Sequence, residues 1–219
     1  MSGNAHGAQR EVNRRDEMSV TIQTFKPEKD FSAAARFARE GMHLDNYAGG
    51  GIAGWLFAAD AMCEAIARST HFYAAYDGAQ FAGFLLADSW GAPKPYEKSR
   101  YGRFHRLIKG LLELSDRRDA ENAYAAANDE MLAALDPAPE VEITYFSADP
   151  SLIGKGVGSK LLAAFERDFA GKRTFLFTDD GCTYQFYEHR GFTCAGERTI
   201  PGAYAEGGSL RCMTYVKQL

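Results

Sequence analysis

The fold is decided by the stretch Asp149-Pro150-Ser151-Leu152-Ile153-Gly154-Lys155-Gly156-Val157-Gly158-Ser159-Lys160-Leu161-Leu162. Its three alternating glycines stand between a predicted strand over 141–147 and a predicted helix over 156–169. Glycine lets the backbone approach a ligand closely and adopt positive φ, and the first turn of a helix offers unpaired N–H groups at the positive end of its dipole. The stretch therefore predicts a pyrophosphate cradle. Its expected members are Gly154, Lys155, Gly156, Val157, Gly158 and Ser159.

The spacing of these glycines excludes two common nucleotide motifs. A Walker loop needs G-x-x-x-x-G-K-[ST], and the chain contains no such run. A dinucleotide fingerprint needs G-x-G-x-x-G, and its last position here is Ser159. A Rossmann turn also places glycine immediately after the strand, whereas residues 148–153 intervene here. A glycine-rich turn without a ligand remains the alternative.

Two motifs resemble those of the GNAT (GCN5-related) N-acetyltransferase superfamily. The first is its coenzyme A signature, R/Q-x-x-G-x-G/A, in which Gly156 and Gly158 are the glycines and Ile153 departs from the Arg/Gln. The second is the run Phe186-Tyr187-Glu188-His189-Arg190-Gly191-Phe192, which is similar to the superfamily's (L/F)-Y-E-x-x-G-F. The order and separation of the two motifs make the resemblance specific.

The resemblance implies an α/β protein with the GNAT acyl-CoA N-acyltransferase fold, a mixed, mostly antiparallel sheet flanked by helices. It also implies an enzyme that uses acetyl-CoA as cosubstrate and acetylates a primary amine by direct attack. Tyr187 is then the general acid for the leaving thiolate, because a phenol with a pKa near ~10 is protonated at neutral pH. Backbone groups of Phe146 and Ala148 are expected to bind the pantetheine arm and the acetyl carbonyl. Tyr187 as a buried aromatic residue is the structural alternative.

Glu142 is the candidate general base, since an attacking amine must first lose a proton. Some superfamily members carry a catalytic Glu on this strand, ahead of the cradle. A solvated carboxylate at the edge of the site is an equal alternative. Covalent catalysis by Cys182 is disfavoured, because direct transfer needs no acyl-enzyme. Asp180 stands where the family often has an Asn that contacts the pantetheine arm.

Hydrophobic periodicity supplies the remaining elements. Pro27 is read as a break and Asp30 as the N-cap of the next helix, and Asp77-Gly78 predicts a hairpin. The order strand, helix, strand around the cradle predicts a parallel crossover. Strands are expected over 20–25, 72–76, 80–88, 141–147, 174–178, 192–199 and 210–216, and helices over 31–42, 55–68, 101–114, 119–135, 156–169 and 183–189.

Residues 1–18 are polar and aperiodic and are expected to form a flexible tail, followed by a single GNAT domain over 19–219. Residues 90–139 are expected to form a helical insertion between the third and fourth strands. Together with the mobile loop around 49–51, this insertion is predicted to line the acceptor site.

Composition excludes several functional classes. The chain has 219 residues, a net charge of −4 and 46% hydrophobic residues, which is ordinary for a globular domain. The acidic excess argues against nucleic-acid binding, and no apolar run is long enough to span a membrane. The first residues do not resemble a secretory signal, so a cytoplasmic protein is expected. The four cysteines and five histidines form no zinc pattern, so we expect no metal.

The expected partner is a small-molecule or peptide amine acceptor, and the resemblance also allows a homodimer. Two other functions stay open. One is a non-catalytic regulatory module that binds acyl-CoA, for which Ile153 and Asp180 are the relevant departures. The other is an ordinary nucleotide-binding protein, which the failed motifs disfavour.

Overall fold

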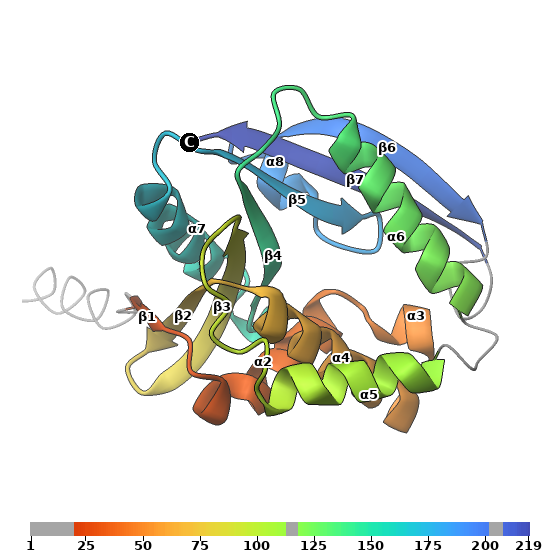
Figure 1. The fold of residues 1–219 in the computed structure, drawn as a ribbon. Coiled ribbons are helices and arrows are strands. Elements are labelled where there is room, and N and C mark those ends of the chain that lie inside the picture. Colours follow the sequence, from red (N-terminus) through yellow and green to blue (C-terminus); the bar gives the residue numbers. More distant parts are fainter. Residues whose placement is uncertain (1–19, 113–117, 202–207) are drawn as a thin grey trace, which may run out of the picture.

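A computed structural model describes residues 20–112, 118–201 and 208–219, with the side chains of 111, 112 and 118–121 excepted (Figure 1). In these residues one seven-stranded sheet has the order β1-β2-β3-β4-β5-β7-β6. Neighbouring strands are antiparallel except β4 and β5, which are parallel. The predicted mixed, mostly antiparallel sheet is thus confirmed. The strands are β1 (Val20–Thr24), β2 (His71–Asp77), β3 (Gln80–Ser89), β4 (Val141–Ala148), β5 (Arg173–Asp179), β6 (Thr193–Pro201) and β7 (Ser209–Gln218).

Helices cover both faces of the sheet (Figure 1). On one face, Leu161 and Phe165 of α7 pack against Leu85 of β3. On the other, Met62 and Ile66 of α4 pack with α2 against the opposite side of the same strands. Because β-strand side chains alternate between faces, β3 supplies both cores. The helices are α2 (Pro27–Gly41), α3 (Asp45–Ala48), α4 (Gly51–Arg68), α5 (Arg100–Leu112), α6 (Arg118–Ala133), α7 (Val157–Asp168) and α8 (Gln185–Glu188), with a 3-10 turn η1 (Pro150–Leu152).

Helix α2 begins at Pro27, so the prediction that Pro27 breaks the chain and Asp30 is the N-cap was wrong. Proline suits the first helical position, because its missing N–H needs no partner there and its φ is already helical. Asp30 caps the helix from within the first turn, where its Oδ2 accepts a hydrogen bond from the Lys26 N–H at 2.9 Å. Helix α4 likewise starts earlier than predicted, at Gly51.

The two helices predicted over 101–114 and 119–135 lie between β3 and β4 as α5 and α6. They attach to different parts of the fold (Figure 1). Tyr101 and Phe104 of α5 extend the core beneath α4, whereas Ala127 and Met131 of α6 pack on β6 and β7. The predicted tail over 1–18 lies outside the described residues. No helix in the described ranges combines the length and apolarity that crossing a membrane requires.

Strands β4 and β5 part soon after they meet. They pair only at Val141 with Thr174 and at Glu142 with Phe175. Beyond that point β4 stays paired with β3 as far as Ala148, and β5 stays paired with β7 as far as Asp179. The register of β4 against β3 also shifts between Leu86 and Ala87. The sheet therefore opens between β4 and β5, at the end where the glycine stretch follows β4.

Candidate active site

The glycine stretch forms the link between β4 and α7. Gly154 and Gly156 have φ of +81° and +80°, and Gly156 is the residue that precedes the first turn of α7. Neither glycine has a neighbour where a Cβ would stand, so the left-handed backbone is what requires glycine at both positions. Gly158 differs, because a Cβ there would come within 3.1 Å of Phe186 Cε2. The predicted cradle therefore lies at the N-terminus of a real helix.

The cradle offers backbone N–H groups more than side chains. The side chain of Val157 is buried in the core, so only its backbone faces outward. The hydroxyl of Ser159 is occupied by the guanidinium of Arg190, which also lies over the Phe186 ring at 3.9 Å from its centroid. Lys155 is exposed, and Ile153, at the family's Arg/Gln position, is 84% exposed. The first-turn amides of α7 are thus the main anion-binding groups here.

Tyr187 of α8 lies beside the opening between β4 and β5. Its ring centroid lies 6.3 Å from that of Phe146, 5.7 Å from Phe192 and 6.3 Å from Tyr215. Burial raises the pKa of Tyr187 above its ordinary value, and Cys182 adds to the rise. The phenol is therefore neutral and able to donate a proton. The structure thus brings Tyr187 and Phe146, two residues of the predicted site, into ring contact.

Glu142 is 6% exposed and lies where β4 and β5 last pair. Arg68, at the end of α4, donates to both of its carboxylate oxygens, to Oε2 at 2.8 Å. Burial raises the pKa of Glu142 to about 7, although the Arg68 guanidinium opposes the rise. A second pair, Lys94 to Asp88 at 2.7 Å, lies beside it, because Asp88 of β3 is the register partner of Glu142. The carboxylate is thus buried and charge-compensated, and its role as the base stays a prediction.

Three solved structures of the same fold are distant from this chain in sequence. A histone acetyltransferase HPA2 and related acetyltransferase from Corynebacterium glutamicum is 18% identical, with a TM-score of 0.57 over 92% of this chain and 97% of its own. Ard1 from Thermoplasma volcanium is 16% identical, with a TM-score of 0.51 over 92% of this chain and 98% of its own. An aminoglycoside 6′-N-acetyltransferase complexed with coenzyme A is 14% identical, with a TM-score of 0.51 over 90% of this chain and 96% of its own. The chain has the GNAT acetyltransferase fold. No family model matches the sequence, and no curated protein is significantly similar to it.

A further buried carboxylate in this GNAT fold, Asp179 at the end of β5, was missed by the sequence reasoning. Its Oδ1 accepts hydrogen bonds from the Tyr47 hydroxyl at 2.8 Å and from the Gly181 N–H at 3.0 Å. The Cys182 thiol donates to the same carboxylate. The signal available was a pair of aspartates directly after a buried strand. Tyr47 lies on α3, and nothing in the sequence connects it with β5.

Cys182 is not a nucleophile in this setting. Burial raises the pKa of its thiol, and the negative charge of Asp179 raises it further. The thiolate is the reactive form of cysteine, so a thiol held protonated is unreactive. This agrees with direct transfer, which the family resemblance implies.

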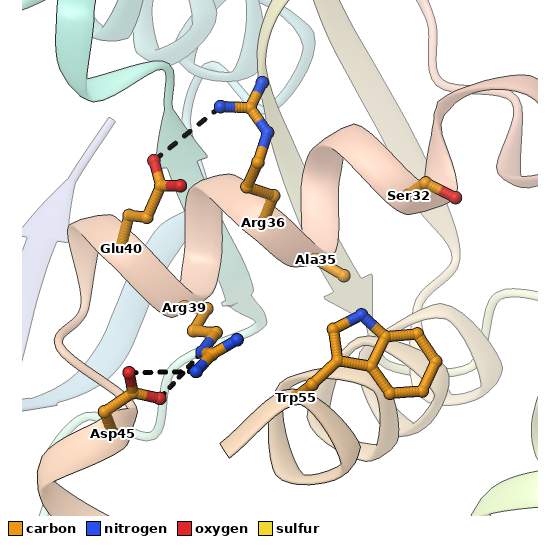
Figure 2. A pocket seen from close by; sticks show the side chains of 7 residues that line it. All are labelled: Ser32, Ala35, Arg36, Arg39, Glu40, Asp45 and Trp55. Atoms are coloured by element: carbon orange, nitrogen blue, oxygen red, sulfur yellow. Dashed lines mark hydrogen bonds and ion pairs between the residues drawn. The ribbon is translucent and has the colours of Figure 1, made fainter. Parts of the chain in front are cut away.

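A shallow hollow of about 400 Å³ lies apart from the cradle and Tyr187, between α2 and the start of α4 (Figure 2). Its charged groups are paired with each other. Arg39 donates to both oxygens of Asp45, at 2.7 and 3.0 Å, and holds the pKa of that carboxyl below its usual range. Arg36 pairs with Glu40 at 3.7 Å. With its charges satisfied, the hollow offers a ligand mainly the exposed indole of Trp55.

Proposed function

We propose that this protein transfers an acetyl group from acetyl-CoA to a primary amine of a small molecule or peptide, by direct attack of the amine on the thioester. The observation that carries the proposal is the parting of β4 and β5 beside a glycine cradle at a helix N-terminus. An opening of this kind gives a long, thin arm a place between two strands whose backbone groups are no longer paired with each other. The cradle lies where the anionic end of such a cosubstrate needs donors.

Each residue then has a chemical task. The backbone of Gly154 to Ser159 holds the pyrophosphate, and β4 at Phe146 and Ala148 binds the pantetheine arm and polarises the acetyl carbonyl. As the amine attacks, the C–N bond forms, the C–S bond breaks, and Tyr187 donates its proton to the thiolate. A phenol of raised pKa suits this task, because a thiolate leaving in the same buried site is more basic than in water.

Glu142 is the proposed base for the amine proton. A carboxyl with a pKa of about 7 can both accept and release a proton near neutral pH. Arg68 keeps this carboxyl oriented through two hydrogen bonds, and it must give way or act through water for the proton to reach Glu142.

The first test is the thermal midpoint in the presence of acetyl-CoA, CoA, ATP and NAD. A ligand at about 100 times its dissociation constant stabilises the folded state by about 2.7 kcal/mol. The same samples are then assayed for thiol release with a mixture of amines, using the wild-type chain and Tyr187→Phe. We expect only the CoA compounds to raise the midpoint, and Tyr187→Phe to slow release without weakening binding.

Two results would redirect the assignment. Binding of acetyl-CoA with no amine-dependent thiol release across a broad panel of amines favours the regulatory acyl-CoA-binding module. Stabilisation by ATP or NAD but not by a CoA compound shows that the cradle serves another nucleotide, and the proposed activity fails.

A further inference from the structure

Among the described residues, no cation pairs with the buried carboxyl group of Asp179. It is 6% exposed, and none of the ion pairs formed between described residues includes it. Asp180, which has the same sign, acts on it and adds to the rise in its pKa. Glu142, buried to the same degree, has Arg68 against both oxygens. Buried carboxylates are rarely left without a paired cation or a metal.

Burial raises the pKa of Asp179, whereas the hydrogen-bond donors around it favour its ionised form. The Tyr47 hydroxyl, the Gly181 N–H and the Cys182 thiol are all donors, and an ionised carboxylate only accepts. These donors form hydrogen bonds with the carboxylate oxygens of Asp179, but they bring no positive charge to it. In the described part of the chain, no group of three His, Cys, Asp or Glu side chains could hold a metal ion. A ligand with a positive charge is therefore the natural complement.

Other polar atoms nearby also lack partners. The Tyr145 hydroxyl, on β4 across the opening, is buried and has no hydrogen-bond partner among the described residues. Burial raises the pKa of Tyr145, and Cys182, which donates a hydrogen bond to Asp179, adds to the rise. On α6, Asn128 Oδ1 is buried without a hydrogen-bond partner in the described ranges, one turn from Tyr124. Burial raises the pKa of Tyr124, and the charge of Asp179 raises it further. An ammonium has three N–H donors to offer such atoms.

The face of β5 that carries Asp179 is lined by aromatic rings. Phe177 and Phe175 precede Asp179 by two and four positions, so all three side chains share one face. Tyr47 stacks on Phe57 with ring centroids 6.3 Å apart, and the ring centroids of Trp90 and Phe175 are 6.0 Å apart. Phe57 and Trp90 remain 37% and 49% exposed. This aromatic lining, completed by Tyr124 of α6, comprises Tyr47, Phe57, Trp90, Tyr124, Phe175 and Phe177.

We propose that Asp179 binds the ammonium group of the acceptor, and that the acceptor is a primary amine attached to an aromatic body. The proposal rests on the acetyltransferase function proposed above and names its substrate class. The carboxylate supplies the charge, and the aromatic lining supplies apolar and cation–π contacts for the rest of the molecule. Tyr187 packs with the core on the α7 face, whereas Asp179 faces α3 and α6, so acid and acceptor approach the opening from opposite sides.

Binding is measured without turnover, by calorimetry of phenethylamine and of phenethyl alcohol on the full chain saturated with CoA at pH 7. The two probes share a ring and a chain and differ in charge. We expect the wild-type chain to bind the amine about 10-fold or more tightly than the alcohol. Asp179→Asn should remove this preference, since Asn keeps the size and one oxygen that can accept from the Tyr47 hydroxyl and the Gly181 N–H, but not the charge. Asp129→Asn, an equal charge change on the exposed face of α6, should preserve it.

A further variant and a further probe sharpen the test. Tyr47→Phe keeps the carboxylate but removes one donor, so the preference for the amine should shrink without disappearing. This variant serves if Asp179→Asn fails to fold. Ethylamine, which lacks the ring, should bind more weakly than phenethylamine; equal affinity overturns the aromatic part of the proposal.

The failure of this proposal is distinct from that of the acetyltransferase function. Equal affinities for amine and alcohol in the wild-type chain, with CoA bound, overturn the role of Asp179 and leave the CoA site standing. An unchanged amine preference in Asp179→Asn does the same. A chain that binds no CoA overturns the acetyltransferase function, and with it this proposal.

Discussion

Replacing Glu142 by Gln should make the chain relatively more stable as the pH rises. Burial gives Glu142 a folded-state pKa of about 7, against an ordinary value of 4.5. The folded state therefore holds a proton over a pH range in which the unfolded chain has released it. Stability from this proton is fully present below about pH 4.5 and is lost as the pH rises through about 7. Gln does not titrate, so the variant has no such loss.

The size of the effect follows from proton linkage. One pKa unit corresponds to about 1.4 kcal/mol, so the whole interval amounts to about 3 kcal/mol, of which about 2 to 3 kcal/mol falls between pH 5 and pH 8. The Gln variant also loses or alters its contacts with Arg68, but that contribution shifts the difference by a nearly constant amount. The quantity to follow is therefore the change with pH in the difference between the two chains.

Urea unfolding at pH 5, 6, 7 and 8 gives the free energy of unfolding of both chains, and the linear extrapolation applies where unfolding is reversible and two-state. Other titrating groups are common to both chains and cancel in the difference. The reasoning is refuted if the difference in free energy of unfolding between the two chains does not change with pH, or if the Gln variant becomes relatively less stable as the pH rises. It would mean that the two hydrogen bonds from the Arg68 guanidinium, and not burial, decide the charge of Glu142. Arg68→Met should move the pH dependence to higher pH, because the opposing cation is gone.

Four more substitutions probe the acid, the cradle, α5 and α6. Tyr187→Phe should lower kcat by about 100-fold with acetyl-CoA affinity unchanged; a loss in binding alone argues for a packing role. Gly156→Ala should cost about 1 to 2 kcal/mol in urea unfolding, because its φ of +80° is strained for any residue with a Cβ. Gly110→Ala, in an open position on α5, should instead stabilise by about 0.5 to 1 kcal/mol. Met131→Ala should cost about 2 to 5 kcal/mol and raise the acceptor KM without affecting CoA binding; an unchanged KM separates α6 from the acceptor site.

The parts of the fold that could be read from the sequence are those fixed by local rules. The glycine spacing located the start of α7, and the strand, helix, strand order gave the parallel pair β4 and β5. The hairpin at Asp77-Gly78 also lies where its turn chemistry places it. The start of α2 was misjudged because proline serves two local roles, breaking a helix or beginning one, and only the capping contact of Asp30 decides between them.

The site could be predicted only where its residues act through the backbone or share one segment. Arg68 meets Glu142 across 74 positions, and Tyr47 meets Asp179 across 132, so neither contact leaves a pattern in the sequence. Such contacts arise when helices on one face of the sheet dock against strands that are far away along the chain. They also decide the electrostatics, since a carboxylate behaves differently with and without a nearby cation.

Two of the buried carboxylates on this face of the sheet, Glu142 and Asp179, show how that difference bears on function. Glu142 lies where β4 and β5 still pair, and Arg68 neutralises it before any ligand arrives. Asp179 lies at the far end of β5, where the strands have parted, and the described residues give it donors but no counter-charge. A buried charge left in this way costs stability in the free protein and is relieved when a cation binds. The closed end of the opening is therefore already neutral, whereas its open end is suited to receive a positively charged acceptor.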